Sequence, residues 1–257
     1  MVRRRLLLLV LTVAIAGGCA EGTSLDASPP ATIVTTAAQP DPSTTSTTTS
    51  AFPVPTTSSG PTTTVAPMFS SSVVAIDERL AARMAPSWRP GCPVPLADLR
   101  YLTLRHWGMD GAVHDGELVV HVDHAATVVG VFAELFAARF PIERMRLVDD
   151  YGGDDQASMR ANNTSAFNCR EVAGRPGVLS NHSRGAAIDL NPLVNPWVAG
   201  RSVDPPEGAP YADRSQRVPG GIYPGDVVTR AFARIGWGWG GDWPSSKDWQ
   251  HFSASGS

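Results

Sequence analysis

A long stretch of small and polar residues near the N-terminus limits how much of this 257-residue chain can fold. From Glu21 to about Ser72 the sequence consists largely of Thr, Ser, Pro and Ala, and it includes the Thr/Ser run 44–49. Such a segment cannot bury enough apolar surface to offset the conformational entropy lost on folding. We therefore expect residues 20–72 to be a disordered linker and residues 73–257 to form one folded domain.

The predicted folded part contains short strands and separate helices. Residues 117–123 alternate apolar and polar side chains, which predicts a strand followed by a helix that its last residue, Asp123, caps. Residues 144–148 predict another strand, and Asp226 is expected to cap a helix that ends near Ile235. This mixture favours an α+β fold with a small antiparallel sheet and flanking helices. The apolar stripe expected on the first helix consists of Val128, Phe132, Leu135 and Phe136.

Two short segments carry the residue types of a metal-dependent active site. The first places His182 before Asp189, and the second places Asp248 before His251. A catalytic zinc site uses three His, Asp, Glu or Cys ligands and keeps one position for water, whose pKa the metal lowers to about 7. His182, Asp189 and His251 could be these ligands, and Asp248 could act as the general base.

The local patterns suggest how these side chains are presented. Residues 186–190 alternate as a short strand that turns Asp189 toward a site, and Gly185 would let the chain turn before it. Two arrangements remain open for the second segment. Asp248 and His251 could be neighbours on one helical turn, or a loop carrying Asp248 could run into a strand.

The first segment resembles a family signature, Ser-x-His-x-x-Gly-x-Ala-x-Asp. The signature is that of the D-alanyl-D-alanine carboxypeptidases and dipeptidases of the VanY type and of the related phage L-alanyl-D-glutamate endopeptidases. Residues 236–243 and 247–252 are similar to the Gly-Trp-x-Trp-Gly-Gly stretch that leads into the last ligand of that family. Residues 140–145 and 158–170 also look like its core, so the resemblance covers roughly residues 95–254. The matched signature positions are Ser180, His182, Gly185, Ala187 and Asp189.

The resemblance implies a zinc peptidase that acts on peptidoglycan stem peptides. It implies Zn²⁺ at His182, Asp189 and His251, with Asp248 as general base. Removal of a terminal D-alanine is the favoured reaction, and cleavage of the L-alanyl-D-glutamate bond is the alternative. A cell-wall binding module that has lost catalysis is a second alternative, although all three ligands and the base are present in this chain.

The resemblance also implies substrate-binding residues near the metal. In the family, a serine and an upstream arginine are expected to bind the substrate carboxylate or polarise the scissile carbonyl. Ser180 is the serine. Arg170 is our first choice for the arginine and Arg160 the second, and a surface salt bridge is the alternative role for either arginine.

The N-terminus predicts export. Arg3 to Arg5 precede an apolar run over residues 6–16, which is shorter than the ~20 residues of a membrane span. The run ends in small residues before Cys19, as in the lipobox of bacterial lipoproteins. We therefore predict that residues 1–19 are a lipoprotein signal peptide, that Cys19 is lipidated, and that the protein is extracytoplasmic on the outer face of the cell membrane. An ordinary signal peptide is the alternative.

The remaining cysteines and the charge complete the expectations. Cys92 and Cys169 are expected to form a disulfide in an oxidising compartment, with two buried free thiols as the alternative. A net charge of −3 without a basic stripe argues against nucleic acid as a partner, and a monomer is expected. The tryptophans near the C-terminus could line a cleft or belong to the core. Structural or solvated roles are expected for His106, His114, His121 and His124.

Overall fold

The computed structural model of this chain describes residues 66–257. The predicted signal peptide with Cys19, and residues 20–65 of the predicted linker, lie outside the described residues. The first described strand, β1 (Ser71–Ala75), begins two residues before the predicted domain start at residue 73. The last residues of the predicted linker are therefore part of the folded unit.

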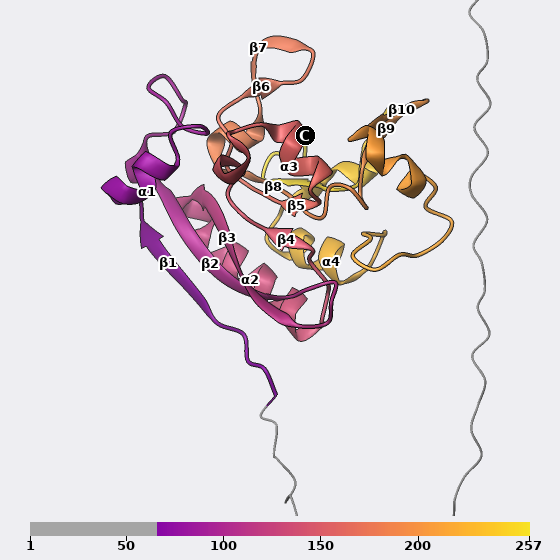
Figure 1. The fold of residues 1–257 in the computed structure, drawn as a ribbon. Helices are drawn as coiled ribbons and strands as arrows, with labels where there is room; N and C mark the ends of the chain where they lie inside the picture. The colour runs from indigo at the N-terminus through magenta and orange to yellow at the C-terminus, as the bar shows by residue number, and fades with distance from the viewer. Residues whose placement is uncertain (1–65) are drawn as a thin grey trace, which may run out of the picture. The chain divides into compact units, whose positions relative to one another are not determined.

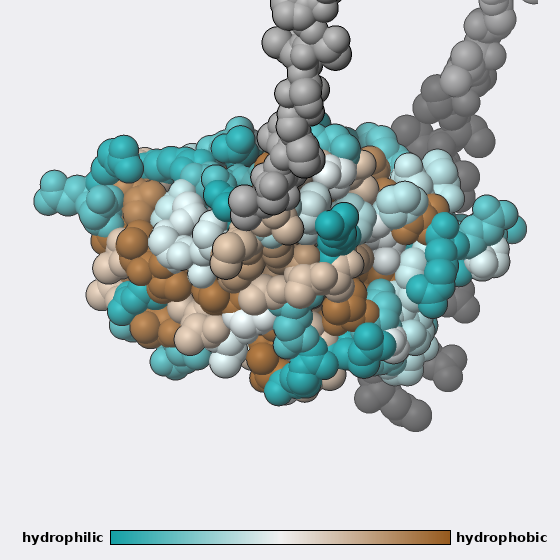
Figure 2. All heavy atoms as spheres, turned by 90° about the horizontal axis from the view of Figure 1, so that it is seen from below, coloured by the Kyte–Doolittle hydropathy of each residue, from teal (hydrophilic) through white to brown (hydrophobic). Residues whose placement is uncertain are grey.

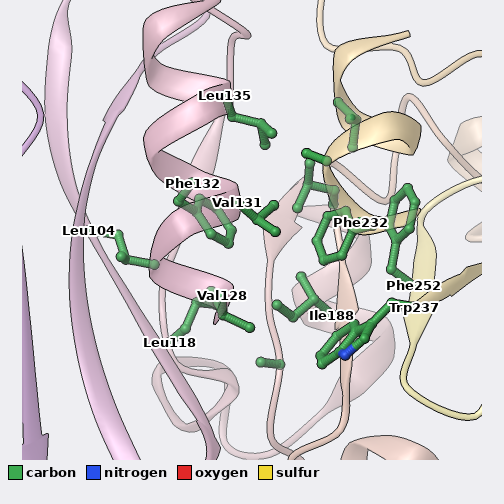
Figure 3. Close-up of a cluster of buried hydrophobic side chains, with 14 of the residues drawn as sticks. Leu104, Leu118, Val128, Val131, Phe132, Leu135, Ile188, Phe232, Trp237 and Phe252 are labelled. Carbon is green, nitrogen blue, oxygen red and sulfur yellow. The ribbon is translucent and has the colours of Figure 1, made fainter. Parts of the chain in front are cut away.

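A three-stranded antiparallel sheet and one long helix form the first layer of the fold (Figure 1). The strand β2 (Leu99–Trp107) lies between β1 and β3 (Val113–His121), and α2 (Val122–Ala137) packs against them. Side chains of α2 point toward Phe232 on α4 (Val227–Arg234), so sheet and helices share one apolar core (Figure 3). The labelled core residues are Leu104, Leu118, Val128, Val131, Phe132, Leu135, Ile188, Phe232, Trp237 and Phe252.

The predicted start of α2 was wrong by two residues. The strand ends at His121, whose main-chain N–H donates to Gly185 O at 2.9 Å, and Val122 already belongs to the helix. The imidazole of His121 caps the helix by accepting from the N–H of Asp123 at 3.2 Å. Asp123 lies in the first turn instead, where a carboxylate also stabilises the positive end of the helix.

The helix predicted after Asp226 is confirmed. The Asp226 carboxylate accepts from the N–H of Thr229 at 2.9 Å, α4 ends before Ile235, and Gly236 follows in a left-handed conformation with φ of +78°. A left-handed glycine is a common stop signal after a helix. The buried residues of α4 are Val228, Ala231 and Phe232.

The predicted strand at residues 144–148 is shorter than expected. Only β4 (Arg144–Met145) pairs, in parallel, with β5 (Asn163–Thr164), and Val148 begins the 3₁₀ helix η2 (Val148–Tyr151). The side-chain amide of Asn163 ends the pairing because it bonds both main-chain groups of Arg146. Its oxygen accepts from the N–H of Arg146 at 2.8 Å, and its nitrogen donates to the carbonyl oxygen at 3.0 Å. Side-chain bonds to the backbone compete with strand ladders in this way.

Two further small sheets carry the residues of interest. One has the order β11–β13–β8 and the other the order β10–β9–β12. In the first, Ile188 and Phe252 are cross-strand partners that point into the apolar core (Figure 3). Because side chains alternate along a strand, their neighbours Asp189 and His251 face the other side. The strands are β8 (Ala187–Asp189), β9 (Trp197–Ala199), β10 (Ser202–Asp204), β11 (Gly238–Trp239), β12 (Lys247–Asp248) and β13 (His251–Ser253).

A disulfide joins Cys92 to Cys169, with 5.9 Å between the Cα atoms. It lies in a second apolar cluster and ties the segment before β2 to the segment that leads into the hairpin β6–β7. The fold is thus α+β, as predicted. The remaining elements are α1 (Glu78–Arg83), α3 (Asp155–Arg160), β6 (Glu171–Val172), β7 (Arg175–Leu179), η1 (Leu96–Asp98), η3 (Asn181–Arg184), η4 (Pro206–Tyr211) and η5 (Gly240–Asp242).

The surface mixes apolar and hydrophilic residues. Seen from below the view of Figure 1, apolar residues reach the surface across the middle of the face and hydrophilic residues surround them (Figure 2). Such mixing is ordinary, because more than half of a folded protein's accessible surface is apolar. Among residues 66–257, no helix combines the length and the apolar character that crossing a membrane requires.

Candidate metal centre

Three buried side chains from separate elements converge on one point. His182 lies in η3, Asp189 ends β8 and His251 begins β13, directly opposite Asp189 in the sheet. Nε2 of His182 lies 3.1 Å from Oδ2 of Asp189, and Nδ1 of His251 lies 2.9 Å from its Oδ1. The two histidine nitrogens are 3.3 Å apart. The sequence-predicted ligands are therefore brought together.

The ring of His182 is held in one orientation by its surroundings. Its Nδ1 lies 2.6 Å from the main-chain oxygen of Ala166, which can only accept a hydrogen bond, so Nδ1 carries the proton. In the neutral ring, Nε2 is therefore the nitrogen with the lone pair, and it faces Asp189 at 3.1 Å. Metal-binding histidines usually donate their second nitrogen to a carbonyl or carboxylate in this manner.

Gly185 makes the turn between His182 and β8 possible. Its φ of +63° is left-handed, and a Cβ atom there would lie 2.5 Å from the main-chain nitrogen of His121. Any other residue would clash with the backbone and would strain the turn. The glycine expected at this turn thus brings η3 close to the end of β3.

The cluster contains one ionised carboxylate facing two imidazoles. Burial works to raise the pKa of Asp189, but His182 and His251 hold it well below its usual range, so the carboxylate is ionised. Burial works to lower the pKa of His182, but the charge and hydrogen bond of Asp189 raise it above its usual value. Two imidazole nitrogens and one carboxylate form a common donor set for catalytic zinc. Ligand atoms of the three residues lie within 4.8 Å of one another, which one metal ion could bridge.

Asp248 enters the site from a different sheet than His251. It ends β12, opposite Trp197 of β9, while His251 begins β13. The pair is therefore not on a helical turn, and the chain passes from one strand to the next between them. Gly240 allows close packing here, because a Cβ atom on it would lie 2.6 Å from the main-chain oxygen of Asp248.

The environment of Asp248 is that of a proton acceptor. Burial raises its pKa to about 7, and the nearby His251 works in the opposite direction. Its Oδ1 is buried without a hydrogen-bond partner within the described residues. A carboxylate with a pKa near neutrality is suited to general base catalysis.

The two predicted arginines differ in their position. The main-chain N–H of Arg170 donates to Oγ of Ser183 at 2.9 Å, immediately beside His182, and its guanidinium lies 2.7 Å from Asp155. Arg160 is exposed at the end of α3 and lines a surface cavity of about 600 Å³ that contains none of the three candidate ligands. The structure thus places Arg170, and not Arg160, beside the candidate metal centre.

Ser180 has a local role in the structure. It caps η3, where its Oγ accepts from the N–H of His182 at 3.3 Å. The hydroxyl is buried, and this bond helps to fix the turn that presents the first ligand. A capping serine can still donate its own proton to a second partner.

Sequence reasoning missed two neighbours of the site. The carbonyl of Ala166 left no signal because any residue type has one, and no sequence pattern singled out Asp155, which the structure places in the first turn of α3. Two of the tryptophans near the C-terminus have the core role that was one of the two expectations. Trp237 and Trp239 are buried in the core, whereas the ring of Trp243 lies beside that of His251 with centroids 5.6 Å apart.

The other histidines lie outside the cluster. His106 is buried, and its Nδ1 lies 3.3 Å from the carbonyl oxygen of Trp107. His114 lies 3.0 Å from Asp110, and His124 packs edge-on against Trp237. Among the described residues, His182, Asp189 and His251 form the one group of three or more His, Cys, Asp or Glu residues that could hold a metal ion.

Comparison with known proteins gives one match. Residues 173–254 match a family model described as D-alanyl-D-alanine carboxypeptidase. This segment contains Asp248 and the three candidate ligands, while Arg170 and Asp155 precede it. No curated protein and no solved structure matches the chain.

Proposed function

We propose that the protein is a zinc-dependent D-alanyl-D-alanine carboxypeptidase that acts on peptidoglycan stem peptides. The match of residues 173–254 to the D-alanyl-D-alanine carboxypeptidase family model supports this proposal. The observation that carries the proposal is the convergence of His182, Asp189 and His251 within the matched segment, with the buried carboxylate of Asp248 beside them. A degenerate binding module would be expected to have lost at least one of these four side chains.

The residues present fit a zinc ion. His182 would bind it through Nε2, His251 through Nδ1 and Asp189 through its carboxylate. Zinc bound there supplies a Lewis acid and lowers the pKa of a bound water to about 7. The carbonyl of Ala166 would keep His182 in the tautomer that this role requires.

Asp248 would carry the proton during hydrolysis. It would take a proton from the attacking water as the oxygen of the water bonds to the peptide carbonyl carbon. It would then donate this proton to the nitrogen of the departing D-alanine as the C–N bond breaks. The pKa of about 7 allows Asp248 to act in both directions near neutral pH.

Arg170 would bind the free carboxylate at the C-terminus of the substrate. A carboxylate transferred from water into a site needs a charged or hydrogen-bonding partner, and arginine suits it well. The Nε of Arg170 is buried without a partner in the described part of the chain, so one donor of its guanidinium is unpaired. Ser180 would add a hydrogen bond from its hydroxyl proton.

One observation favours a second candidate, an L-alanyl-D-glutamate endopeptidase. Arg170 already has the carboxylate of Asp155 as a partner, which reduces the positive charge that it offers to a terminal carboxylate. The test compares a stem pentapeptide with its C-terminally amidated form, using mass spectrometry of the products. Loss of D-alanine release on amidation supports the carboxypeptidase, and equal cleavage of both peptides at an internal bond assigns the endopeptidase.

We also propose that the protein works outside the cytoplasm, held at the outer face of the membrane by lipid on Cys19. The Cys92–Cys169 disulfide supports an oxidising compartment. Cys19→Ser should release the protein from membranes, because the lipid on Cys19 would be what attaches the protein to the membrane. Membrane fractionation that finds the variant still bound would contradict this proposal.

A further inference from the structure

Arg170 has a fixed partner that lies outside the matched family segment. Its Nη2 lies 2.7 Å from Oδ2 of Asp155, and the side chains are 27% and 24% exposed. Asp155 begins α3, whereas Arg170 directly follows the disulfide-bonded Cys169. The ion pair therefore connects α3 to the segment that leads into the hairpin β6–β7 and then to His182.

The main chain of Arg170 is held independently of this ion pair. Its N–H donates to Oγ of Ser183 at 2.9 Å, and the same hydroxyl donates to its carbonyl oxygen at 2.6 Å. The disulfide restrains the residue before it. The remaining freedom of Arg170 is in its long side chain, whose orientation depends on the groups around the guanidinium.

Two contacts set that orientation. Nη2 forms the ion pair with Asp155, and Nη1 donates to the main-chain oxygen of Glu171 at 3.2 Å. The Nε is buried and has no partner within residues 66–257. A planar guanidinium restrained at both terminal nitrogens presents its remaining N–H groups in fixed directions.

The pair also lies within electrostatic reach of the metal ligands. Burial is the largest influence on the pKa of Asp155 and raises it, Arg170 lowers it, and the charge of Asp189 raises it again. The N–H of Arg170 is hydrogen-bonded to Ser183, the residue after His182, so the ion pair lies beside the segment that carries the first candidate ligand.

We propose that Asp155 is a positioning residue for Arg170, which it orients so that the guanidinium meets the substrate in one fixed geometry. The inference rests on the proposed function, in which Arg170 binds substrate. A side chain that is ordered in advance loses less conformational freedom on binding. Without Asp155, Arg170 would remain charged but would turn more freely, and substrate binding would suffer more than the hydrolysis of bound substrate.

The test uses the full-length protein with Asp155→Asn, which keeps the size of the side chain and removes its charge. KM for the stem pentapeptide should rise about 10- to 100-fold, the scale of a misplaced binding group, with a smaller change in kcat and unchanged zinc content. In an Arg170→Ala background the same substitution should change KM by less than about twofold, because the two residues act as one unit. Asp154→Asn is the matched control, since Asp154 is an exposed neighbouring acid and asparagine also caps helices.

A second readout tests the contact without relying on catalysis. In ¹⁵N-arginine-labelled protein, the Arg170 guanidinium signals, assigned by their absence in Arg170→Lys, should show restricted rotation that disappears in Asp155→Asn and persists in Asp154→Asn. If the wild-type protein cleaves no stem peptide but these signals respond, the proposed function fails and the positioning role stands. Three results would overturn the positioning role. They are unchanged guanidinium signals in Asp155→Asn, loss of zinc from that variant, and a KM increase in the double variant equal to the product of the increases in the two single variants.

Discussion

The apolar layer of the fold and the region that carries the candidate metal centre are stabilised by different means. In the layer formed by β2, β3, α2 and α4, buried side chains such as Phe132 and Phe232 pack in a continuous core. In the metal region the elements are two to four residues long, and side chains of buried asparagine and serine bind the main chain instead. Regular periodicity organises the first region. Individual hydrogen bonds organise the loops of the second, whose strands β8 and β13 join the same core through Ile188 and Phe252.

Asn195 illustrates the second kind of stabilisation. It is fully buried, its amide nitrogen donates to the carbonyl oxygens of Leu190, Asn191 and Gly220, and its oxygen accepts from Ile222 N at 2.8 Å. This one side chain thus holds the loop that follows β8, the strand that ends with Asp189. The comparison shows that ligand geometry can be fixed without long strands or helices, through buried side chains such as Asn195 whose polar atoms are paired with the main chain.

The largest expected effect is a loss of zinc and turnover that leaves the apolar core intact. His182→Ala or His251→Ala removes a metal ligand, so zinc affinity and turnover should each fall by more than ~10²-fold, beyond the loss expected for an outer-sphere residue. The apolar core is untouched, so circular dichroism should still report a folded protein. His114→Ala is the matched control, since His114 lies outside the ligand cluster. Full zinc occupancy in either ligand variant would show that the ligand assignment is wrong.

A change at Asp248 should separate metal binding from catalysis. Asp248→Asn keeps the size of the side chain and all three ligands, so zinc should remain while kcat falls by ~10² to 10⁴, the range for a lost general base. Steady-state kinetics together with elemental analysis measure both quantities. Near-normal turnover with zinc retained would remove Asp248 from the mechanism.

A smaller effect is expected at Gly240. Gly240→Ala would place a methyl group 2.6 Å from the main-chain oxygen of Asp248 and 2.7 Å from its Cβ, so the base must shift. We expect kcat to fall about 10-fold, because misplacement of a catalytic group costs less than its removal. Gly130→Ala is the control, since nothing lies within 4 Å of a Cβ atom at that position. Equal kinetics in both variants would show that Gly240 does not set the position of Asp248.

The smallest effect on catalysis is expected from the core. Phe132→Ala creates a cavity beside α2 and should reduce the free energy of unfolding by about 3–5 kcal/mol. Zinc content and kcat per folded molecule should change little below the unfolding transition, because the metal region is held by its own polar bonds. A loss of zinc from the folded variant would mean that the two regions are more tightly coupled than the comparison suggests.

The sequence predicted the features that depend on local pattern. The helix after Asp226 and the turn at Gly185 follow from a capping residue and from a glycine with positive φ, both of which leave local signals. The start of α2 was misplaced because an imidazole, an uncommon cap, takes the place expected for Asp123. Strand β4 is short because Asn163 binds the main chain beside it, which is a contact between residues distant in sequence.

The candidate metal centre shows the same difference between features that have a local sequence signal and features that depend on contacts between distant segments. The matching signature identified the residue types for the candidate centre, and the structure brings them together. Neither the Asp155–Arg170 ion pair nor the carbonyl of Ala166 under His182 had a sequence signal, because both depend on how separate elements fold together. The choice between Arg170 and Arg160 as the arginine beside the site likewise required the three-dimensional structure.

The most direct test of the central claim is the zinc content of the purified full-length protein, measured beside its Asp189→Asn variant. Asparagine keeps the shape of Asp189 but removes the charge that both histidines face. The account predicts close to one zinc per chain in the wild-type protein, a large loss of zinc in Asp189→Asn, and loss of peptidase activity in parallel. A wild-type protein that cleaves stem peptides without bound metal, or a variant that keeps its zinc and its activity, would contradict it.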